Sequence, residues 1–280
     1  MRMRFLQSLV YTRKFIRTQK KESLIAIIIG VIISALVVWI TGEDMFTNYE
    51  STKTGFFTLV SACIWIGIFN SIQLICREKK DIVKDELDKR LHATSYIAAH
   101  FIFQFFLCFI QAIIIMAISW FTIDFNANGV IFVHSIVEYF VTIFLLIYAA
   151  DALALIISAI VPTSIVAMTV MPLVLILQLV MSGVLFELSD ASEVVANITI
   201  SKWGMAAMGC IGFLNDTDNL PSKILEKNPT LPLPEREIEA IYEHTAGHLL
   251  SVWLILIGFI VISYILASLS LKATTKRLSK

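Results

Sequence analysis

The sequence predicts an all-α, polytopic membrane protein with six membrane-spanning helices. Three observations support this fold class: the composition is apolar, the apolar residues form long segments, and the polar segments between them differ in charge. Hydrophobic residues make up 58% of the 280 residues and charged residues only 16%, with a mean hydropathy of +0.81. These values exclude a soluble globular domain and a disordered chain. A formal net charge of zero gives no indication of nucleic acid, and none is expected as a partner.

The chain opens with a basic amphipathic segment, residues 1–22, which we expect to lie as a helix on an anionic lipid membrane surface. Bulky apolar residues such as Phe5, Leu9 and Ile16 are interleaved with its bases. A signal peptide is the competing interpretation, but the basic region is too long and no small-residue cleavage site follows it. The bases are Arg2, Arg4, Arg13, Lys14, Arg17, Lys20 and Lys21.

Six apolar segments follow, each long enough to cross a hydrocarbon core of about 30 Å at about 1.5 Å per residue. Turn residues separate several of them, among them the Asn and Gly residues of 122–130 and Pro162. A large polar segment, 187–247, precedes the last apolar segment, and the chain ends in a basic tail, 272–280. The expected spans are 23–41, 56–76, 96–121, 131–160, 165–186 and 248–271, within a membrane domain of residues 23–271.

The basic residues gather in alternate polar segments. The N-terminal segment, the charged run after the second span and the C-terminal tail hold most of them, and six spans would place all three on one side. By the positive-inside rule we expect both termini and the charged run on the cytoplasmic side of the cell membrane.

The charged run Arg77–Leu91, REKKDIVKDELDKRL, lies between two apolar segments and therefore marks a turn at a membrane surface. Its apolar residues recur at helical spacing, which predicts a short helix with one apolar face. Two interpretations stay open: a solvated helix with salt bridges, or a docking helix that passes force from a soluble partner to the membrane part. The apolar face consists of Ile82, Val83, Leu87 and Leu91, and the i,i+4 pairs are Asp85–Lys89 and Glu86–Arg90.

Asp151 lies deep in the fourth expected span. Burying an acidic side chain there costs free energy, so such a residue usually faces a partner or water. It is either a polar relay or cation site, or a hydrogen-bonded acid that locks helix packing. Amide side chains in the other spans fit interhelical hydrogen bonds as well as a substrate path. The candidates for a substrate path or polar relay are Asn70, Gln73, Asp151 and Gln178, and His100, Gln104 and Gln111 lie close to one face of the third span.

Two sets of segments together resemble the membrane domain of type-2 ABC transporters. In the first, a span running FTLVSACIWIGIFNSIQLICRE leads into the charged helix, and SYIAAHFIFQ opens the next span. In the second, MPLVLILQLVMSGVLFEL is followed by ITISKWGMAAMG. The chain is similar to the G-subfamily (White-like) half-transporters and their bacterial counterparts over nearly its whole length.

The resemblance implies the permease subunit of an exporter, working as a homodimer with the substrate path between the subunits. It also implies an N-terminal connecting helix, a cytoplasmic coupling helix that contacts an ATPase, and outer re-entrant helices between spans five and six. The chain departs from eukaryotic members in having only Cys210 where they usually carry a disulfide. The residues that would couple to the ATPase are Arg77, Glu78, Ile82, Val83, Leu87 and Leu91.

A nucleotide site of the form G-x-x-x-x-G-K-[ST] is missing from the sequence. The most similar spacing, Gly204 to Gly209, lacks the lysine that would hold the phosphates. We therefore expect no enzyme and no cofactor on this chain, with ATP and Mg bound by a separate ABC ATPase subunit.

Two other classes stay open. An intramembrane hydrolase would need a nucleophile with a base or a metal pair, and the sequence has no G-x-S-x-G or H-E-x-x-H motif. The second class is a membrane anchor or sensor subunit that transports nothing. His244 and His248 stand four residues apart, but without an internal glutamate we expect no metal site.

Overall fold

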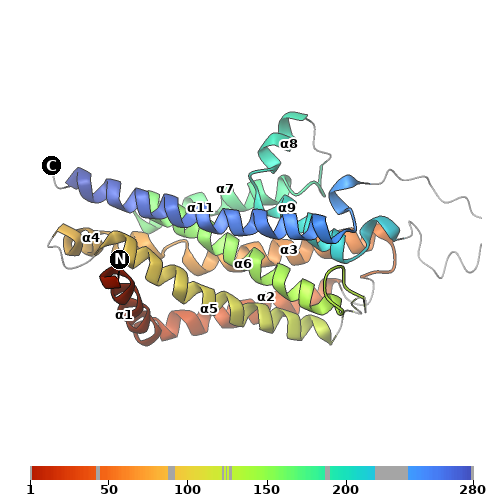
Figure 1. The fold of residues 1–280 in the computed structure, drawn as a ribbon, viewed down its shortest axis with the longest axis horizontal. Helices are drawn as coiled ribbons and strands as arrows, with labels where there is room; N and C mark the ends of the chain where they lie inside the picture. Colours follow the sequence, from red (N-terminus) through yellow and green to blue (C-terminus); the bar gives the residue numbers. More distant parts are fainter. Residues whose placement is uncertain are drawn as a thin grey trace, which may run out of the picture.

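The computed structural model describes residues 2–41, 45–87, 92–121, 123, 125, 128–186, 190–217 and 239–278. In these ranges the protein is a bundle of long α-helices, and none of them forms a strand longer than an isolated bridge, so the predicted all-α class is confirmed. Figure 1 shows most helices along one axis, with α1 running across one end. The helices are α1 (Arg2–Thr18), α2 (Lys20–Thr41), α3 (Tyr49–Ser71), α4 (Leu74–Leu87), α5 (Ala93–Trp120), α6 (Ser135–Ile160), α7 (Ser164–Val180), α8 (Asp190–Ala196), α9 (Ile200–Ile211), η2 (Leu214–Asp216), η3 (Ala240–Tyr242) and α11 (Ala246–Leu278).

Five helical segments of the described residues are long and apolar enough to cross a membrane: α2, α3 continued by α4, α5, α6 and α11. The chain is therefore a multi-pass membrane protein. The predicted fifth span, 165–186, is shorter than expected, because α7 has 17 residues and ends at Val180. At about 1.5 Å per residue this helix falls short of a hydrocarbon core of about 30 Å. Gly183, with φ 77°, then turns the chain away from the helix axis.

The short helix α9 lies inside the bundle, although its residues belong to the segment 187–247 that was predicted to lie outside the spans. Of its twelve residues only Trp203 is not buried, and the helix contacts α3, α6, α7 and α11. Small residues allow this close packing: a Cβ on Gly209 would lie 2.3 Å from the ring of Tyr242. Figure 1 shows the preceding α8 projecting from the side of the bundle. Part of the segment in which outer re-entrant helices are expected thus packs inside the bundle.

Several helix ends also differ from the predicted boundaries. Helix α3 begins seven residues before the predicted 56, because the side chain of Asn48 accepts a hydrogen bond from Ser51 N at 2.8 Å and caps the helix. The polar first turn is held further by Lys53, which pairs with Glu239 at 2.6 Å. Helix α11 continues to Leu278, so most of the predicted tail, 272–280, is helical.

The closest helix pair in the core is α3 with α6. Gly67 makes the approach possible, since a Cβ at this position would lie 2.3 Å from the carbonyl oxygen of Ile147 and 2.7 Å from Cβ of Ala150. Apolar side chains at the outside of the bundle are left exposed, such as Trp39 on α2 at 82% and Leu254 on α11 at 67%. Such surfaces suit contact with lipid.

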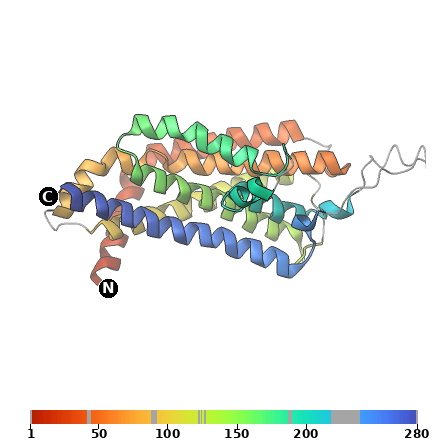
Figure 2. The ribbon, with the colours of Figure 1, turned by 90° about the horizontal axis from the view of Figure 1, so that it is seen from above.

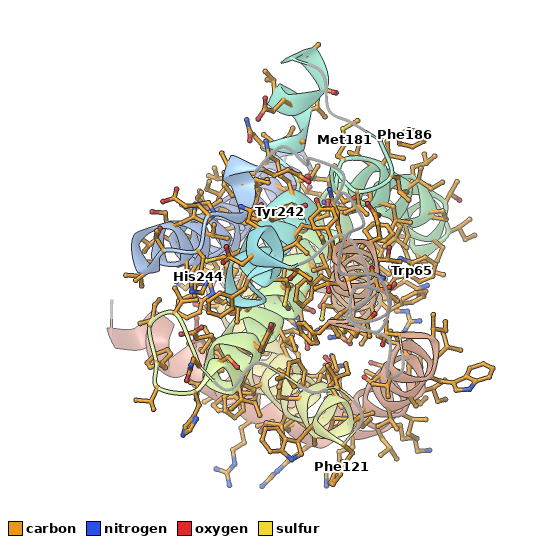
Figure 3. The ribbon with its side chains drawn as sticks, turned by 90° about the vertical axis from the view of Figure 1, so that its right-hand side faces the viewer. Trp65, Phe121, Met181, Phe186, Tyr242 and His244 are labelled. Carbon is orange, nitrogen blue, oxygen red and sulfur yellow. The ribbon has the colours of Figure 1, made fainter. Side chains whose placement is uncertain are left out.

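Helix α7 lies along one side of the bundle and α11 along the opposite side (Figure 2). Both termini and α4 lie at the same end (Figure 1), so the basic segments of the sequence are gathered there, as their charge pattern predicts. Figure 3 looks onto the other end, where Tyr242 and His244 lie over the middle of the bundle and Phe121 lies at its edge. The two ends therefore differ in composition, and the end that carries α1 and α4 holds the candidate site.

Candidate functional site

The apolar face of α4 is closed by the protein's own helices. Ile82 and Val83 are 3% and 4% exposed, and Ile82 packs in a cluster with residues of α5, α6 and α11, among them Tyr96, Leu155 and Leu271. The predicted burial of these two residues is confirmed. Leu91 lies outside the described residues, as do the side chain of Leu87 and the partners of the predicted pairs Asp85–Lys89 and Glu86–Arg90.

The opposite face of α4 carries charges of both signs and is exposed. None of the α4 side chains that the structure describes as exposed is apolar, so a partner on this face would be recognised by charge and hydrogen bonding. The exposed residues are Arg77, Glu78, Lys80, Asp81 and Lys84.

The bend between α3 and α4 is made by a serine of α6. Ser158 Oγ accepts hydrogen bonds from Ile75 N at 3.0 Å and Cys76 N at 3.1 Å, at the first turn of α4. A side chain that takes over backbone N–H groups in this way interrupts the helical hydrogen-bond ladder and kinks the helix. Ser158 is itself fully buried, so the start of α4 is fixed to α6.

A lysine of α4 also contacts the C-terminal end of α6. Lys79 Nζ donates to the carbonyl oxygens of Ala159 at 2.6 Å, Ile160 at 3.3 Å and Val161 at 3.3 Å. These carbonyls belong to the C-terminal end of α6, where an ammonium group satisfies free acceptors and the negative end of the helix dipole. Ser158 and Lys79 together form what we call the α4–α6 clamp.

The remaining side chains near the bend connect α4 to α2 and α5. Tyr96 Oη donates to Glu78 Oε2 at 2.6 Å, which ties the start of α5 to α4. Arg77 donates to Gln73 at 2.5 Å and pairs with Glu22 at 3.2 Å, although both members of that pair are more than half exposed. An ion pair as exposed as this contributes little to stability.

Asp151 lies at the contact of α3, α5 and α6 and is fully buried. Ser71 Oγ donates to Asp151 Oδ1 at 2.5 Å and accepts from Gln104 Nε2, so one side chain from each of three helices takes part. The second oxygen of Asp151, Oε1 of Gln104 and both ring nitrogens of His100 are buried without a hydrogen-bond partner among the described residues. We call Asp151, Ser71 and Gln104 the polar core.

Asn70 and Gln73 line a cavity of about 420 Å³ near the same end of the bundle. Its polar wall also includes Glu22, Arg77 and Glu78, and its apolar wall comes from α2, α3 and Met168 of α7. The cavity thus joins an ionic region beside α4 to an apolar region between α2 and α7. Asn70 additionally exchanges hydrogen bonds of 2.8 and 3.1 Å with Gln111 of α5.

Gln178, the fourth predicted polar candidate, lies away from this cavity. Its Oε1 accepts from Ile200 N and Ser201 N, both at 3.0 Å, and so caps the start of α9. The side chain of Thr199, in the N-cap position, makes no cap hydrogen bond there, which explains the need for an acceptor from another helix. The structure gives Gln178 a positioning role at this helix start.

The two histidines of the opposite end are both bonded to backbone. His244 Nδ1 lies 2.6 Å from Cys210 O, and His248 Nε2 lies 2.9 Å from Ile241 O. No group of three or more His, Cys, Asp or Glu residues that could hold a metal ion occurs in the described part of the chain.

Sequence analysis did not single out Ser71, Ser158, Lys79 or Tyr96. Serine is common in apolar helices, where it usually bonds its own backbone, as Ser34 does with Gly30 O at 2.6 Å. Lys79 is one of several bases in a charged run and differs from them only in its position on the helix. The useful signal is helical phase: Lys79, Ile82 and Val83 lie on the face of α4 that turns toward α6.

Comparison with known proteins gives the class of the molecule. The family model described as ABC-2 type transporter matches residues 7–208. The chain therefore belongs to the ABC-2 type transporter family, as its predicted resemblance indicates, and it is the transmembrane, permease component of an ABC transporter and not the ATPase. No match to this chain was found among curated proteins.

Proposed function

We propose that this chain is the permease subunit of an exporter, and that two copies work with a separate ABC ATPase that binds ATP and Mg. The observation that carries the proposal is the construction of α4. The described residues of its apolar face are buried by its own bundle, its charged face is exposed, and the α4–α6 clamp fixes it to α6. A helix fixed in this way can transmit movement, and a loosely attached loop cannot.

In this proposal the end that carries α1, α4 and both termini faces the cytoplasm of a cell. The match of charge sorting with the arrangement in Figure 1 supports this orientation. The sixth crossing is made by α7 together with α9, since α7 alone is short and α9 continues inside the bundle.

The cavity lined by Asn70 and Gln73 is the proposed entrance of the substrate path. It lies beside the polar core and within one helical turn of the bend between α3 and α4, so a shift of α4 would change its walls. Substrate binding and ATPase binding can influence each other only if each changes the position of an element that they share. In this proposal α4 is that element.

The test of ATPase docking uses matched charge reversals. The chain is co-expressed and co-purified with a candidate ABC ATPase, as wild type, Asp81→Lys and Glu50→Lys. Both carboxylates are exposed, Asp81 on α4 and Glu50 on the first turn of α3 at the other end. We expect Asp81→Lys to weaken association about tenfold, as a changed rim charge can, and Glu50→Lys to have no effect. Equal association of the two variants would exclude α4 as the docking helix.

The polar core has a separate test. Asp151→Asn keeps an acceptor for Ser71 but removes the carboxyl group, so a relay would lose transport while expression and dimerisation remain. If Asp151 only locks packing, Asp151→Asn is tolerated and Asp151→Leu disturbs assembly. Normal transport by the Asp151→Asn variant in proteoliposomes would contradict the relay interpretation.

A further inference from the structure

Helix α1 has two opposite faces of different character. One face is a buried stripe of Ser8, Thr12, Phe15 and Gln19, which packs against α5 and places Thr12 Oγ1 3.4 Å from Ala99 O. These residues recur at helical spacing, so the residues between them point away from the bundle. The exposed face carries Val10, Arg13, Lys14 and Arg17.

The charge of this exposed face is of one sign only. No acidic residue precedes Glu22 in the sequence, whereas α4 alternates Lys80 and Lys84 with Glu78 and Asp81. Among the described residues, the ion pairs join Lys53, Arg77 and Lys202 to acids, and none includes a base of α1. Within the described part of the chain, the bases of α1 are therefore left without an ion-pair partner.

The position of α1 suits the headgroup region of a bilayer. The chain bends at Gln19, so that α1 runs across the end of the bundle from which α2 starts (Figure 1). Helix α2 exposes Leu24 and Ile25 at 58% and 57%, one turn after its first bases. A helix at the level where such a span leaves the hydrocarbon lies among lipid headgroups, and Val10, 66% exposed, can contact the upper acyl region.

We propose that the basic face of α1 is a binding surface for anionic phospholipid headgroups and that bound lipid sets the position of α4. Lys and Arg side chains beside an anionic leaflet are attracted to its surface potential. The single sign of its charge favours a lipid surface over a protein partner, which would offer charges of both signs.

Aromatic contacts connect α1 to α4. Phe15 stacks on His100 with ring centroids 4.2 Å apart, and its ring lies 5.7 Å from that of Tyr96. Tyr96 in turn donates to Glu78 of α4. Burial and the nearby carboxylate of Asp85 raise the pKa of Tyr11, so α4 also lies close to α1 directly. This second half of the proposal rests on the proposed coupling function, whereas lipid binding does not.

The first experiment measures lipid binding by the full chain alone, without an ATPase. The protein is reconstituted in phosphatidylcholine bilayers that contain spin-labelled phosphatidylglycerol or spin-labelled phosphatidylcholine, and the motionally restricted fraction of each gives the lipid preference. We expect wild type to prefer phosphatidylglycerol, less so at high salt. Arg13→Gln/Arg17→Gln should lower the preference by up to about fivefold for each base removed.

Two matched variants decide the origin of the effect. Lys80→Gln/Lys84→Gln removes the same charge from α4 and should keep the preference, and Arg13→Lys/Arg17→Lys keeps the charge of α1 and should keep it too. A preference that is equal in wild type and Arg13→Gln/Arg17→Gln, or that falls as much in the α4 variant, would overturn the lipid surface on α1.

The second experiment measures ATP hydrolysis by the complex with its ATPase in phosphatidylcholine bilayers with and without phosphatidylglycerol. We expect phosphatidylglycerol to change the rate for wild type but not for Arg13→Gln/Arg17→Gln. Tyr96→Phe should keep the lipid preference and lose this response, because it removes the bond to Glu78. A wild-type hydrolysis rate that does not depend on phosphatidylglycerol would contradict the link to α4. A chain that prefers the lipid but activates no ATPase would contradict the proposed function alone.

Discussion

Helices α6 and α7 follow each other in the chain but are held in very different ways. Helix α6 is buried along its length and has polar contacts at its start, middle and end. Helix α7 buries four residues, namely Ala167, Met171, Leu175 and Gln178, and only the last of these anchors it by a hydrogen bond to another helix. We conclude that α6 is the fixed element of the bundle, and that α7 is the one that can move with the least loss of contacts.

The contacts of α6 are spaced evenly along it. Glu138 at its start accepts from the backbone N–H groups of Val130, Ile131 and Phe132, and Trp253 Nε1 donates to Thr142 Oγ1 at 2.9 Å. The polar core lies at its middle and the α4–α6 clamp at its end. A force that reaches α4 therefore has a direct path to α6 through the clamp.

The largest effect is expected at Glu138, which is fully buried. Glu138→Ala removes the acceptor of three partly buried backbone N–H groups, and we expect a loss of about 3 kcal/mol, since each hydrogen bond contributes about 1 kcal/mol. Thermal unfolding in detergent measures it. Glu50→Ala, which removes an exposed acid, is the control, and equal midpoints for the two variants would contradict the anchoring of α6 at its start.

A smaller effect is expected at the clamp. Ser158→Ala leaves Ile75 N and Cys76 N without an acceptor at the bend, at a cost of about 1–3 kcal/mol. Ser158→Thr keeps the hydroxyl. The control is Ser251→Ala, since Ser251 is exposed and bonded to its own helix. Of these variants, only Ser158→Ala should weaken the response of ATP hydrolysis to substrate. Intact coupling in that variant would show that the clamp transmits nothing.

The smallest effect is expected for Gln178, which anchors α7 to α9. Gln178→Leu removes the cap of α9, and a lost cap typically costs about 1 kcal/mol. Hydrogen exchange at Ile200 and Ser201 should become faster, while the amides of α6 stay protected. Gln178→Glu keeps the acceptor and should leave exchange unchanged, so faster exchange throughout α6 would mean that the two helices are not independent.

Sequence patterns predicted the parts of this arrangement that depend on composition and period. The apolar face of α4 follows from the spacing of Ile82 and Val83, and the lipid-facing helices follow from their hydropathy. The burial of α9 does not follow from composition or period, because the close packing of its Gly residues depends on Tyr242 and Leu146 from elsewhere in the chain. The role of Glu138 could not be predicted either, since nothing local in the sequence shows that three backbone groups converge on it.

The most direct test of the account measures distances between spin labels in the complex with its ATPase, with and without a non-hydrolysable ATP analogue. One pair, Lys84→Cys and Val137→Cys, joins α4 to the far end of α6, and the other, Val137→Cys and Leu173→Cys, joins α6 to α7. All three positions carry exposed side chains, and the native cysteines are buried. If α4 and α6 form one unit, the first distance stays constant while the second shifts by several ångströms. A first distance that shifts while the second stays constant would contradict the fixed role of α6.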